Sequence, residues 1–280
     1  MKLKQKIAVE YVKMKFKLLS LFSTKKAAEE ALDLFRTPQR RAKKKPTAIF
    51  NEAEKMEFVL DDIPIHGYRW NKGASKRVLI IHGFESSIVN FEQYIRPLIK
   101  KGYEVLAFDA PAHGRSGGKT ISAPLFAKMI VTIYQAFGPI HSFIAHSFGG
   151  LALSLALEKT DHDANYKVVL IAPSTETKTA IDQFFALLQL KPAVRKEFDK
   201  LIAELGGNPA EWYSVHRAVK NIKAEVLWLH DEDDLQTPVD DALKVKEENL
   251  PHVTFIITKG LGHRRIYRDH KVMQQVLDFL

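Results

Sequence analysis

Apolar side chains recur at helical spacing within the first 36 residues of the chain. The recurring positions are Ile7, Tyr11, Met14, Leu18, Leu21 and Phe22. A spacing of three and four residues places them on one face of a helix. Thr37-Pro38 marks the expected end of this helical stretch, because a residue before proline disfavours the helical conformation. A basic linker at 40–45 follows and ends at Pro46.

From residue 56 onward the apolar runs become short and are separated by turn residues. We expect strands at 56–60, 65–70, 77–81, 103–108, 142–146, 166–171, 224–230 and 253–258. Helical patterns lie between or after the later strands, at 126–137, 148–158, 239–248 and 267–279. This alternation predicts an α/β fold with a mostly parallel sheet that is covered by helices on both faces.

The alternation stops between Pro173 and Ile222, where a long helical pattern rich in leucine and phenylalanine intervenes. We therefore divide the chain into an arm with its linker at 1–46 and an α/β domain at 47–280, with a helical insertion at about 174–221. The inserted helices either pack on the body or form a cap over a functional site. Their phenylalanines either bind an apolar group of a substrate or pack the insertion's own core.

Charge separates the arm from the rest of the chain. Residues 1–46 hold 14 of the 42 lysines and arginines but only 4 of the 33 acidic residues, so the arm has a net charge of +10 and the rest of the chain, at −1, is balanced. We expect no nucleic acid-binding body. The basic amphipathic arm, 1–36, is expected to pack on the body or on a second subunit, or to lie peripherally on an anionic membrane.

Composition excludes several classes of site. The chain has no cysteine, which excludes disulfides, thiolate catalysis and cysteine-based metal sites. Charged residues interrupt the apolar positions near the N-terminus, so we expect neither a signal peptide nor a spanning helix. The expected location is the cytoplasm.

A serine stands at an expected strand-to-helix turn, in the motif Ala145-His146-Ser147-Phe148-Gly149-Gly150. This is the context of a nucleophile elbow, in which a tight turn presents a serine hydroxyl at the top of a sheet. The residues two before and two after the serine must be small; Gly149 satisfies this, and Ala145 adds one methyl group. An ordinary strand–turn–helix corner is the alternative interpretation.

A second motif, His82-Gly83-Phe84, directly follows the expected strand 77–81. A backbone N–H from such a loop can pair with the N–H that follows a nucleophile to bind an oxyanion. The backbone amides of Phe84 and Phe148 are the candidates, and His82, Gly83, His146 and Gly149 are expected to shape the site. A simple strand-ending turn would also explain Gly83.

An acidic loop and a late histidine follow the last two expected strands. The run His230-Asp231-Glu232-Asp233-Asp234 precedes Pro238, and it lacks the glycine and distal glutamate of a calcium loop, so we expect no metal there. One of its carboxylates is expected to orient a histidine, with the others solvated. His263 follows the strand 253–258, on an expected loop beside Gly262. Serine, acid and histidine thus come in the chain order of an α/β-hydrolase triad, each after a strand.

Over about residues 55–280 these motifs resemble the α/β-hydrolase superfamily, in the bacterial branch that carries His-Gly-Phe/Trp, Asp-Ala-Pro-Ala-His-Gly-Arg-Ser and His-Ser-Phe/Leu-Gly-Gly. The second motif occurs here as 109–116, where His113 is expected to organise a loop. The resemblance implies an eight-stranded, mostly parallel sheet with a helical cap after the sixth strand, at 174–221. It also implies that Ser147 is the nucleophile and His263 the general base. Asp234 matches the position of the family's acid better than Asp231 or Asp233.

The expected activity is hydrolysis of a carboxylic ester or thioester of a small, apolar substrate through an acyl-enzyme, without a cofactor or metal. Two alternatives remain. A peptidase acting on small peptides would need a carboxylate to hold the substrate amine, from 231–234 or from Glu85. A non-catalytic hydrolase-fold protein would bind at a membrane through its arm.

Overall fold

The chain forms two compact units in a computed structural model, which describes residues 3–41 and 46–280. The described part of Met1–Thr37 and the segment Glu176–Tyr213 form one, here called the helical unit. Pro38–Thr175 and Ser214–Leu280 form the other, the sheet unit. The arm and the larger part of the segment between Pro173 and Ile222 therefore belong to the same unit, although 139 positions separate Thr37 from Glu176 in the sequence.

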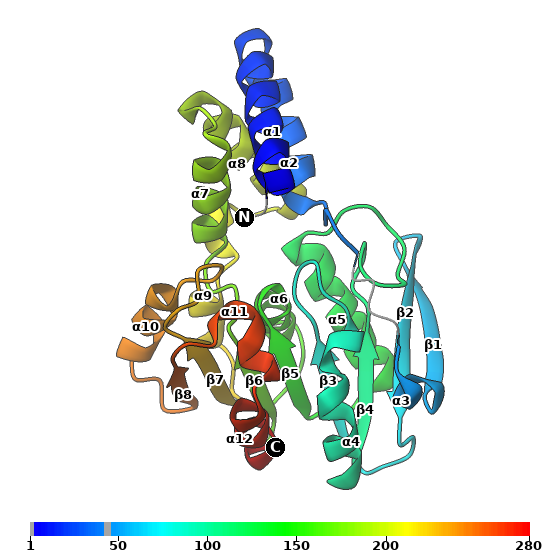
Figure 1. Ribbon diagram of the computed structural model, residues 1–280. Coiled ribbons are helices and arrows are strands. Elements are labelled where there is room, and N and C mark those ends of the chain that lie inside the picture. Colours follow the sequence, from blue (N-terminus) through cyan, green and yellow to red (C-terminus); the bar gives the residue numbers. More distant parts are fainter. Residues whose placement is uncertain (1–2, 42–45) are drawn as a thin grey trace. The chain divides into compact units, whose positions relative to one another are not determined.

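The sheet unit is built on one eight-stranded sheet (Figure 1). Its strands are β1 (Glu54–Leu60), β2 (Ile63–Trp70), β3 (Lys76–Ile81), β4 (Tyr103–Phe108), β5 (Ser142–His146), β6 (Lys167–Ile171), β7 (Glu225–Asp231) and β8 (Val253–Thr258). They lie in the order β1-β2-β4-β3-β5-β6-β7-β8. Only the β1–β2 and β2–β4 pairings are antiparallel, which confirms the expected mostly parallel sheet.

Helices cover both faces of this sheet. They are α3 (Ala48–Asn51), η1 (Ile88–Phe91), α4 (Glu92–Lys100), α5 (Ala123–Phe137), α6 (Phe148–Leu157), α9 (Val215–Val219), α10 (Val239–Glu247), α11 (Gly262–Arg265), η3 (Ile266–Arg268) and α12 (His270–Phe279). Val78 and Ile80 of β3 share a core with side chains of α4 and α12, while Leu79 between them is buried outside that cluster. Because side chains alternate along a strand, both faces of β3 are covered.

Helix α6 directly follows β5, and all of its residues from Gly149 to Leu157 are buried. A helix that is apolar all round needs neighbours on every side. It contacts α5, α9 and the strands β3 and β5. The turn before α6 therefore rests on the packed core of the sheet unit.

The helical unit consists of α1 (Leu3–Phe22), α2 (Thr24–Arg36), α7 (Thr177–Leu188), α8 (Pro192–Gly206) and η2 (Ala210–Trp212). The single helical stretch expected at 1–36 is two helices, because the Ser23 side chain caps α2 by accepting a hydrogen bond from Lys26 N at 3.1 Å. Phe185 and Phe198 are buried in the unit's own core, with ring centroids 5.1 Å apart. The core interpretation of these phenylalanines is therefore the one that the structure favours.

The apolar stripe identified in the sequence is not the one that packs within the helical unit. Ile7, Tyr11, Met14 and Leu18 are all more than half exposed. Phe16 is buried instead, and it joins the core of the unit with partly buried neighbours on its own side of α1.

The chain leaves the sheet unit after β6 and re-enters it before β7. Val215 N donates a hydrogen bond to Thr175 O at 2.8 Å, so the two ends of the excursion meet at the sheet unit. On the other side of the boundary, Thr177 N donates to Tyr213 O at 3.2 Å. The segment Glu176–Tyr213 of the helical unit lies inside the expected insertion at 174–221, whose last part, with α9, belongs to the sheet unit. A role as a cap over the active site stays a prediction.

Within residues 3–41 and 46–280, none of the helices combines the length and apolar character needed to cross a bilayer.

The fully buried carboxylate of Glu104 in β4 holds two arginines, Arg69 at 2.9 Å and Arg77 at 3.1 Å. Burial acts to raise the pKa of Glu104, but the Arg69 hydrogen bond, the Gly73 amide and both guanidinium charges hold the pKa below its usual value. We predict that Glu104→Ala lowers the free energy of unfolding by about 3 kcal/mol, because two partly buried cations lose their partner.

Urea denaturation of wild type and variant measures this difference. The control is Glu54→Ala, which removes an exposed pair with Lys72 and should cost under about 1 kcal/mol. Equal losses in the two variants would contradict the assigned role of Glu104.

Candidate active site

Ser147 occupies the sharp turn between β5 and α6 with φ +54° and ψ −125°. A non-glycine residue in this region carries about 1–3 kcal/mol of strain. The turn is held by its own hydrogen bonds: Ser147 N donates to Ile171 O of the neighbouring strand at 3.1 Å, and Ser147 O accepts from Gly150 N and Ser174 N. These bonds fix the direction of the serine side chain above the sheet.

Three glycines allow backbones to meet around this turn. A Cβ on Gly149 would lie 2.4 Å from His82 O, and one on Gly83 would lie 2.8 Å from the Cβ of Ser147. A Cβ on Gly150 would lie 2.8 Å from a side-chain carbon of Pro173. The 82–84 loop therefore lies directly against the serine. Ala145, two residues before the serine, is fully buried, so its methyl group is accommodated.

His263 joins the serine to a carboxylate. Its Nε2 lies 3.0 Å from Ser147 Oγ, and its Nδ1 lies 2.7 Å from Asp234 Oδ2. The structure thus brings the three predicted side chains together from positions after β5, β7 and β8. His263 lies on the short helix α11, not on an extended loop as we expected.

Asp234 is fixed by four hydrogen bonds. Its Oδ1 accepts from Gln236 N and Thr237 N, and its Oδ2 accepts from the Thr237 hydroxyl at 2.8 Å as well as from His263. Burial acts to raise the pKa of this carboxyl, but the hydrogen bond and charge of His263, with the two backbone amides, hold its pKa below the usual value. Asp234 is therefore ionised at neutral pH. Thr237, which the sequence analysis did not single out, also lies 3.1 Å from Nδ1 of His263.

The neighbouring carboxylates of the acidic loop position the histidine. Asp231 accepts hydrogen bonds from Leu261 N at 3.0 Å and Gly262 N at 2.7 Å, and Asp233 accepts from Gly260 N at 2.9 Å. Asp231 is fully buried. The expectation that the residues beside the triad acid are solvated is therefore wrong for Asp231. An acidic run does not reveal in sequence that backbone amides some thirty positions later will surround it.

His82 fixes the orientation of the peptide bond between Gly83 and Phe84. It is fully buried, and burial lowers its pKa to about 4 although the hydrogen bond to Gly83 raises it. The neutral ring donates from Nδ1 to Gly83 O at 2.8 Å and accepts from Ala110 N at Nε2, 3.0 Å away. Because carbonyl and amide of one peptide plane point in opposite directions, holding Gly83 O also sets the direction of Phe84 N–H.

His113 organises the same loop, as expected. Burial, together with the charge of His82, lowers its pKa to about 3. Its Nε2 accepts a hydrogen bond from Glu85 N at 3.0 Å, and its Nδ1 donates to Pro111 O at 2.8 Å. Two neutral histidines thus hold consecutive parts of the 82–85 loop.

His146 lies beneath His263. Its Nε2 donates to His263 O at 3.0 Å, and the two rings are 4.7 Å apart. Burial, and then the charge of His263, lowers its pKa well below the usual value. Its Nδ1 is buried and finds no hydrogen-bond partner among the described residues. His146 therefore supports the position of His263 as an uncharged ring.

The backbone amides of Phe84 and Phe148 donate to no residue in the described part of the chain. Phe148 N is the first amide of α6, where the helix dipole favours negative charge. The two phenyl rings meet edge to face with centroids 6.2 Å apart, and Phe84 is 36% exposed. Two available N–H groups and an apolar surface thus belong to the loops that flank Ser147.

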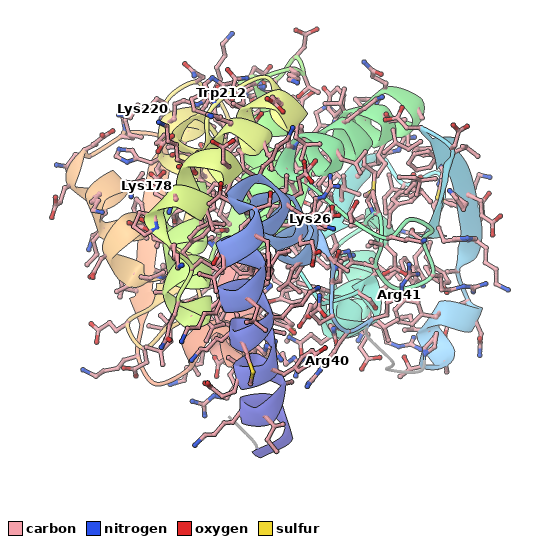
Figure 2. All side chains as sticks on the ribbon, turned by 90° about the horizontal axis from the view of Figure 1, so that it is seen from above. Lys26, Arg40, Arg41, Lys178, Trp212 and Lys220 are labelled. Carbon is pink, nitrogen blue, oxygen red and sulfur yellow. The ribbon has the colours of Figure 1, made fainter. Side chains whose placement is uncertain are left out.

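Residues at the start of the basic linker contact the 82–85 loop and the segment 116–118. Gln39 N donates to a carboxylate oxygen of Glu85 at 2.9 Å. Arg41, labelled in Figure 2, donates from its guanidinium to Ser116 O at 2.8 Å and to Gly118 O at 2.7 Å. Residues 42–45 of the expected linker lie outside the described residues. Among those that are described, no cluster of three or more His, Asp or Glu side chains is arranged to hold a metal ion.

Residues 72–230 match the model of a protein family described as serine aminopeptidase, S33. The match covers more than half of the chain and includes both the 82–84 loop and Ser147. The chain belongs to this family of α/β hydrolases. It is therefore a hydrolase.

Curated relatives carry no assigned substrate in their names. The chain is 28% identical over 122 residues to the uncharacterized hydrolase YugF of Bacillus subtilis, in an alignment that covers 42% of this chain and 44% of YugF. It thus spans under half the length of that relative. It is 26% identical over 258 residues to the uncharacterized protein YqkD of the same organism, with 82% and 81% covered.

A solved structure extends the likeness to the fold. The esterase Pf2001 of Pyrococcus furiosus is 25% identical to this hydrolase, with a TM-score of 0.65. The superposition covers 87% of this chain and 95% of Pf2001.

The depressed pKa of His82 predicts a pH dependence of stability. In the unfolded chain a histidine titrates near pH 6.5 and in the folded protein His82 titrates near pH 4, so the unfolded state binds more protons between these values. The stability contribution of neutral His82 is complete above pH 6.5 and is lost as the pH falls towards 4, by about 3 kcal/mol. We predict that His82→Asn, which keeps a donor for Gly83 O, shows a correspondingly smaller loss on acidification.

Urea unfolding at pH 7 and pH 4.5 measures both slopes. The exposed His270→Asn is the control and should follow wild type. A His82→Asn variant with the wild-type pH slope would rule out this role for His82.

Proposed function

We propose that this hydrolase cleaves carboxylic esters or thioesters through an acyl-enzyme on Ser147. The observation that carries the proposal is the continuous hydrogen-bonded chain from Asp234 through His263 to Ser147, with links of 2.7 and 3.0 Å. Nucleophile, base and orienting acid are in hydrogen-bond reach without rearrangement.

The reaction begins when His263 Nε2 takes the Ser147 hydroxyl proton as Oγ attacks the substrate carbonyl carbon. Asp234 holds the imidazole in the tautomer that leaves Nε2 free and stabilises the imidazolium that forms. The tetrahedral oxyanion then accepts hydrogen bonds from the amides of Phe84 and Phe148. The imidazolium returns its proton to the leaving alcohol or thiol, and water activated by the same histidine releases the acid.

An apolar acyl group fits the surface beside Ser147. Phe84 and Phe148 supply rings next to the amides assigned to the oxyanion, and Phe126 packs 5.7 Å from Phe148. The proposed apolar binding surface is therefore formed by these rings and not by the phenylalanines of the insertion, because Phe185 and Phe198 are buried in the core of the helical unit. Esters with small apolar acyl groups are the substrates we propose.

A peptidase is the alternative that the family description favours, and the carboxylates near the site argue against it. Such an enzyme needs a carboxylate for the substrate ammonium group. Asp231, Asp233 and Asp234 accept hydrogen bonds from the chain itself, and Glu232 pairs with Lys259. Glu85 accepts from Gln39 N. Comparison of a nitrophenyl ester with an amino acid nitroanilide separates the two activities.

We predict that Ser147→Ala reduces ester hydrolysis by at least about a thousandfold and abolishes covalent labelling by a fluorophosphonate probe. The fold is retained, because alanine removes only the hydroxyl. Labelling followed by mass mapping places the adduct on Ser147 in wild type. A modified residue elsewhere, or undiminished labelling of the alanine variant, would overturn the assignment.

We predict that Asp234→Asn lowers kcat by about 10³–10⁴, because the amide cannot stabilise the imidazolium and favours the wrong tautomer. The matched control, Asp233→Asn, removes a neighbouring carboxylate that contacts only Gly260 N among these loop amides and should lose less than about tenfold. Steady-state kinetics on a nitrophenyl ester compares them. A larger loss at position 233 would mean that the triad acid is misassigned.

A further inference from the structure

Helix α1 carries two apolar stripes, and only one of them has a partner. The inner stripe, Val9, Val12, Phe16 and Leu19, packs into the core of the helical unit. The outer stripe is Ile7, Tyr11, Met14, Leu18, Leu21 and Phe22. At 3.6 residues per turn the two stripes lie about 150° apart around the helix axis. The inner stripe therefore anchors α1 while the outer one faces away from that core.

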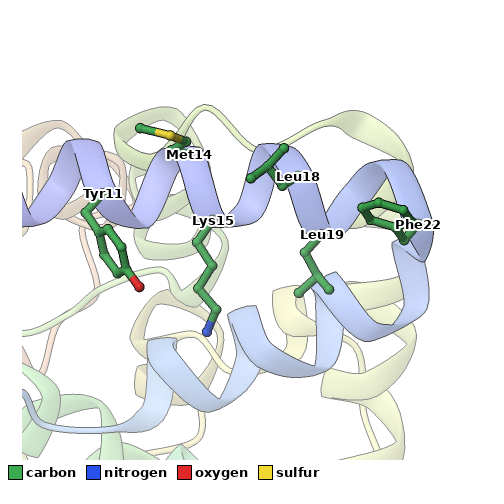
Figure 3. Close-up of a pocket in the computed structure, with 6 residues that line it drawn as sticks. All are labelled: Tyr11, Met14, Lys15, Leu18, Leu19 and Phe22. Carbon is green, nitrogen blue, oxygen red and sulfur yellow. The ribbon is translucent and has the colours of Figure 1, made fainter.

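Every side chain of the outer stripe is exposed by more than half, from 53% for Leu18 to 87% for Phe22. The remaining four are Ile7, Tyr11, Met14 and Leu21. An open apolar groove lies along part of this stripe, and Figure 3 shows Met14 and Leu18 on the upper side of the helix, with Lys15 and Leu19 on the lower side. A contiguous exposed apolar surface of this kind marks an interaction site.

Basic side chains flank the outer stripe. Lys6, Lys13 and Lys17 follow it along one edge of α1, and Lys15 lies on the other edge. The helix carries five lysines against the single acidic residue Glu10. The arm as a whole holds the entire excess positive charge of the chain, while the rest is balanced. Residues 1–37 hold 9 lysines and arginines against 4 acidic residues, and the other 5 basic residues of the arm lie in 38–46, which belong to the sheet unit. About half of the arm's excess positive charge therefore accompanies the apolar stripe.

We propose that the outer stripe of α1 binds the surface of a membrane that contains anionic lipid. A helix with bulky apolar side chains on one face and lysines along its edges lies in the interface plane, with its apolar face between the headgroups and acyl chains. Lys6 and Lys17 then meet lipid phosphates, which attract them within a Debye length, whereas Lys13 and Lys15 pair with Glu10 and Glu30 of the chain itself. This proposal is independent of the chemistry at Ser147.

The same charges disfavour a second copy of the chain as the occupant. In a twofold dimer through this stripe, each α1 would face an identical helix with the same lysine edges. Like charges would then be brought together around the apolar contact, which destabilises it. An anionic lipid surface neutralises these charges, so the pattern favours lipid over self-association.

The test is co-sedimentation of the full-length protein with vesicles, using the Ser147→Ala background so that binding is read without hydrolysis. Vesicles of phosphatidylcholine with about 30% phosphatidylglycerol, which mimic an anionic leaflet, are compared with vesicles of pure phosphatidylcholine. We expect at least about tenfold stronger binding to the anionic vesicles at low salt, weakening as salt is raised.

Two variants separate the apolar and the electrostatic contributions. The double variant Met14→Gln with Leu18→Gln removes apolar area from the outer stripe, and glutamine is still a good helix former. We expect it to lower vesicle binding by about tenfold or more. Its control is Val59→Gln with Leu235→Gln, which changes two exposed apolar side chains of the sheet unit. Lys6→Gln with Lys17→Gln should reduce binding to anionic vesicles by about tenfold, whereas Lys119→Gln with Lys223→Gln should not. Far-UV circular dichroism checks that each variant stays helical.

Three results would overturn the proposal. The first is equal binding, or no binding, to the two vesicle types. The second is undiminished binding by the Met14/Leu18 variant. The third is a dimer in light scattering that this variant converts to a monomer, which would make a second copy the occupant. Absence of esterase activity from the wild-type protein, with vesicle binding intact, would instead count against the proposed function alone.

Discussion

Close approach of backbones at the ends of β3 and β5 is the constraint on which the site depends. The 82–84 loop and the Ser147 turn come so near that neither Gly83 nor Gly149 has room for a methyl group. That approach puts the serine side chain, the first turn of α6 and the Phe84 amide in one small volume. The other residues of the site orient the groups that this contact has already brought together.

The groups of the site are oriented by side chains that are either uncharged or have their charge fully paired with hydrogen-bond donors. His82, His113 and His146 are buried rings whose pKa values are depressed, so all three are uncharged at neutral pH. His82 and His113 each donate one hydrogen bond and accept another, whereas His146 only donates. Asp231 and Asp234 are the opposite case, since hydrogen-bond donors outweigh burial and keep both pKa values low. The result is preorganisation: dipoles and charges are in place before a substrate arrives.

Much of the fold follows from the sequence because its signals are local. The strands at 103–108 and 253–258 were predicted with their exact bounds, since apolar runs there end at turn residues. Helix α4 was missed because Pro97 lies inside it, and a proline argues against a helix interior. The order of Ser147, Asp234 and His263 along the chain was enough to propose which side chains meet.

Features set by contacts between distant segments were out of reach. Nothing near Asp231 indicates that it will be buried under the amides of 261 and 262, and nothing near His263 indicates a four-residue helix. The two stripes of α1 also overlap in the sequence pattern. Period alone identifies apolar faces, but which of two faces packs depends on the shape of the core it meets.

The hydrogen bond from Val215 to Thr175 closes the sheet unit where the chain departs. Because the ends of the excursion already touch, its length and sequence place no demand on the pairing of β6 with β7, and longer or shorter excursions cost little. In this chain, however, α2 packs against α8, so the excursion shares its core with the N-terminal arm. Replacement of one segment alone would leave an apolar surface of the other exposed, so a change of core side chains in one segment has to be matched by a change in the other.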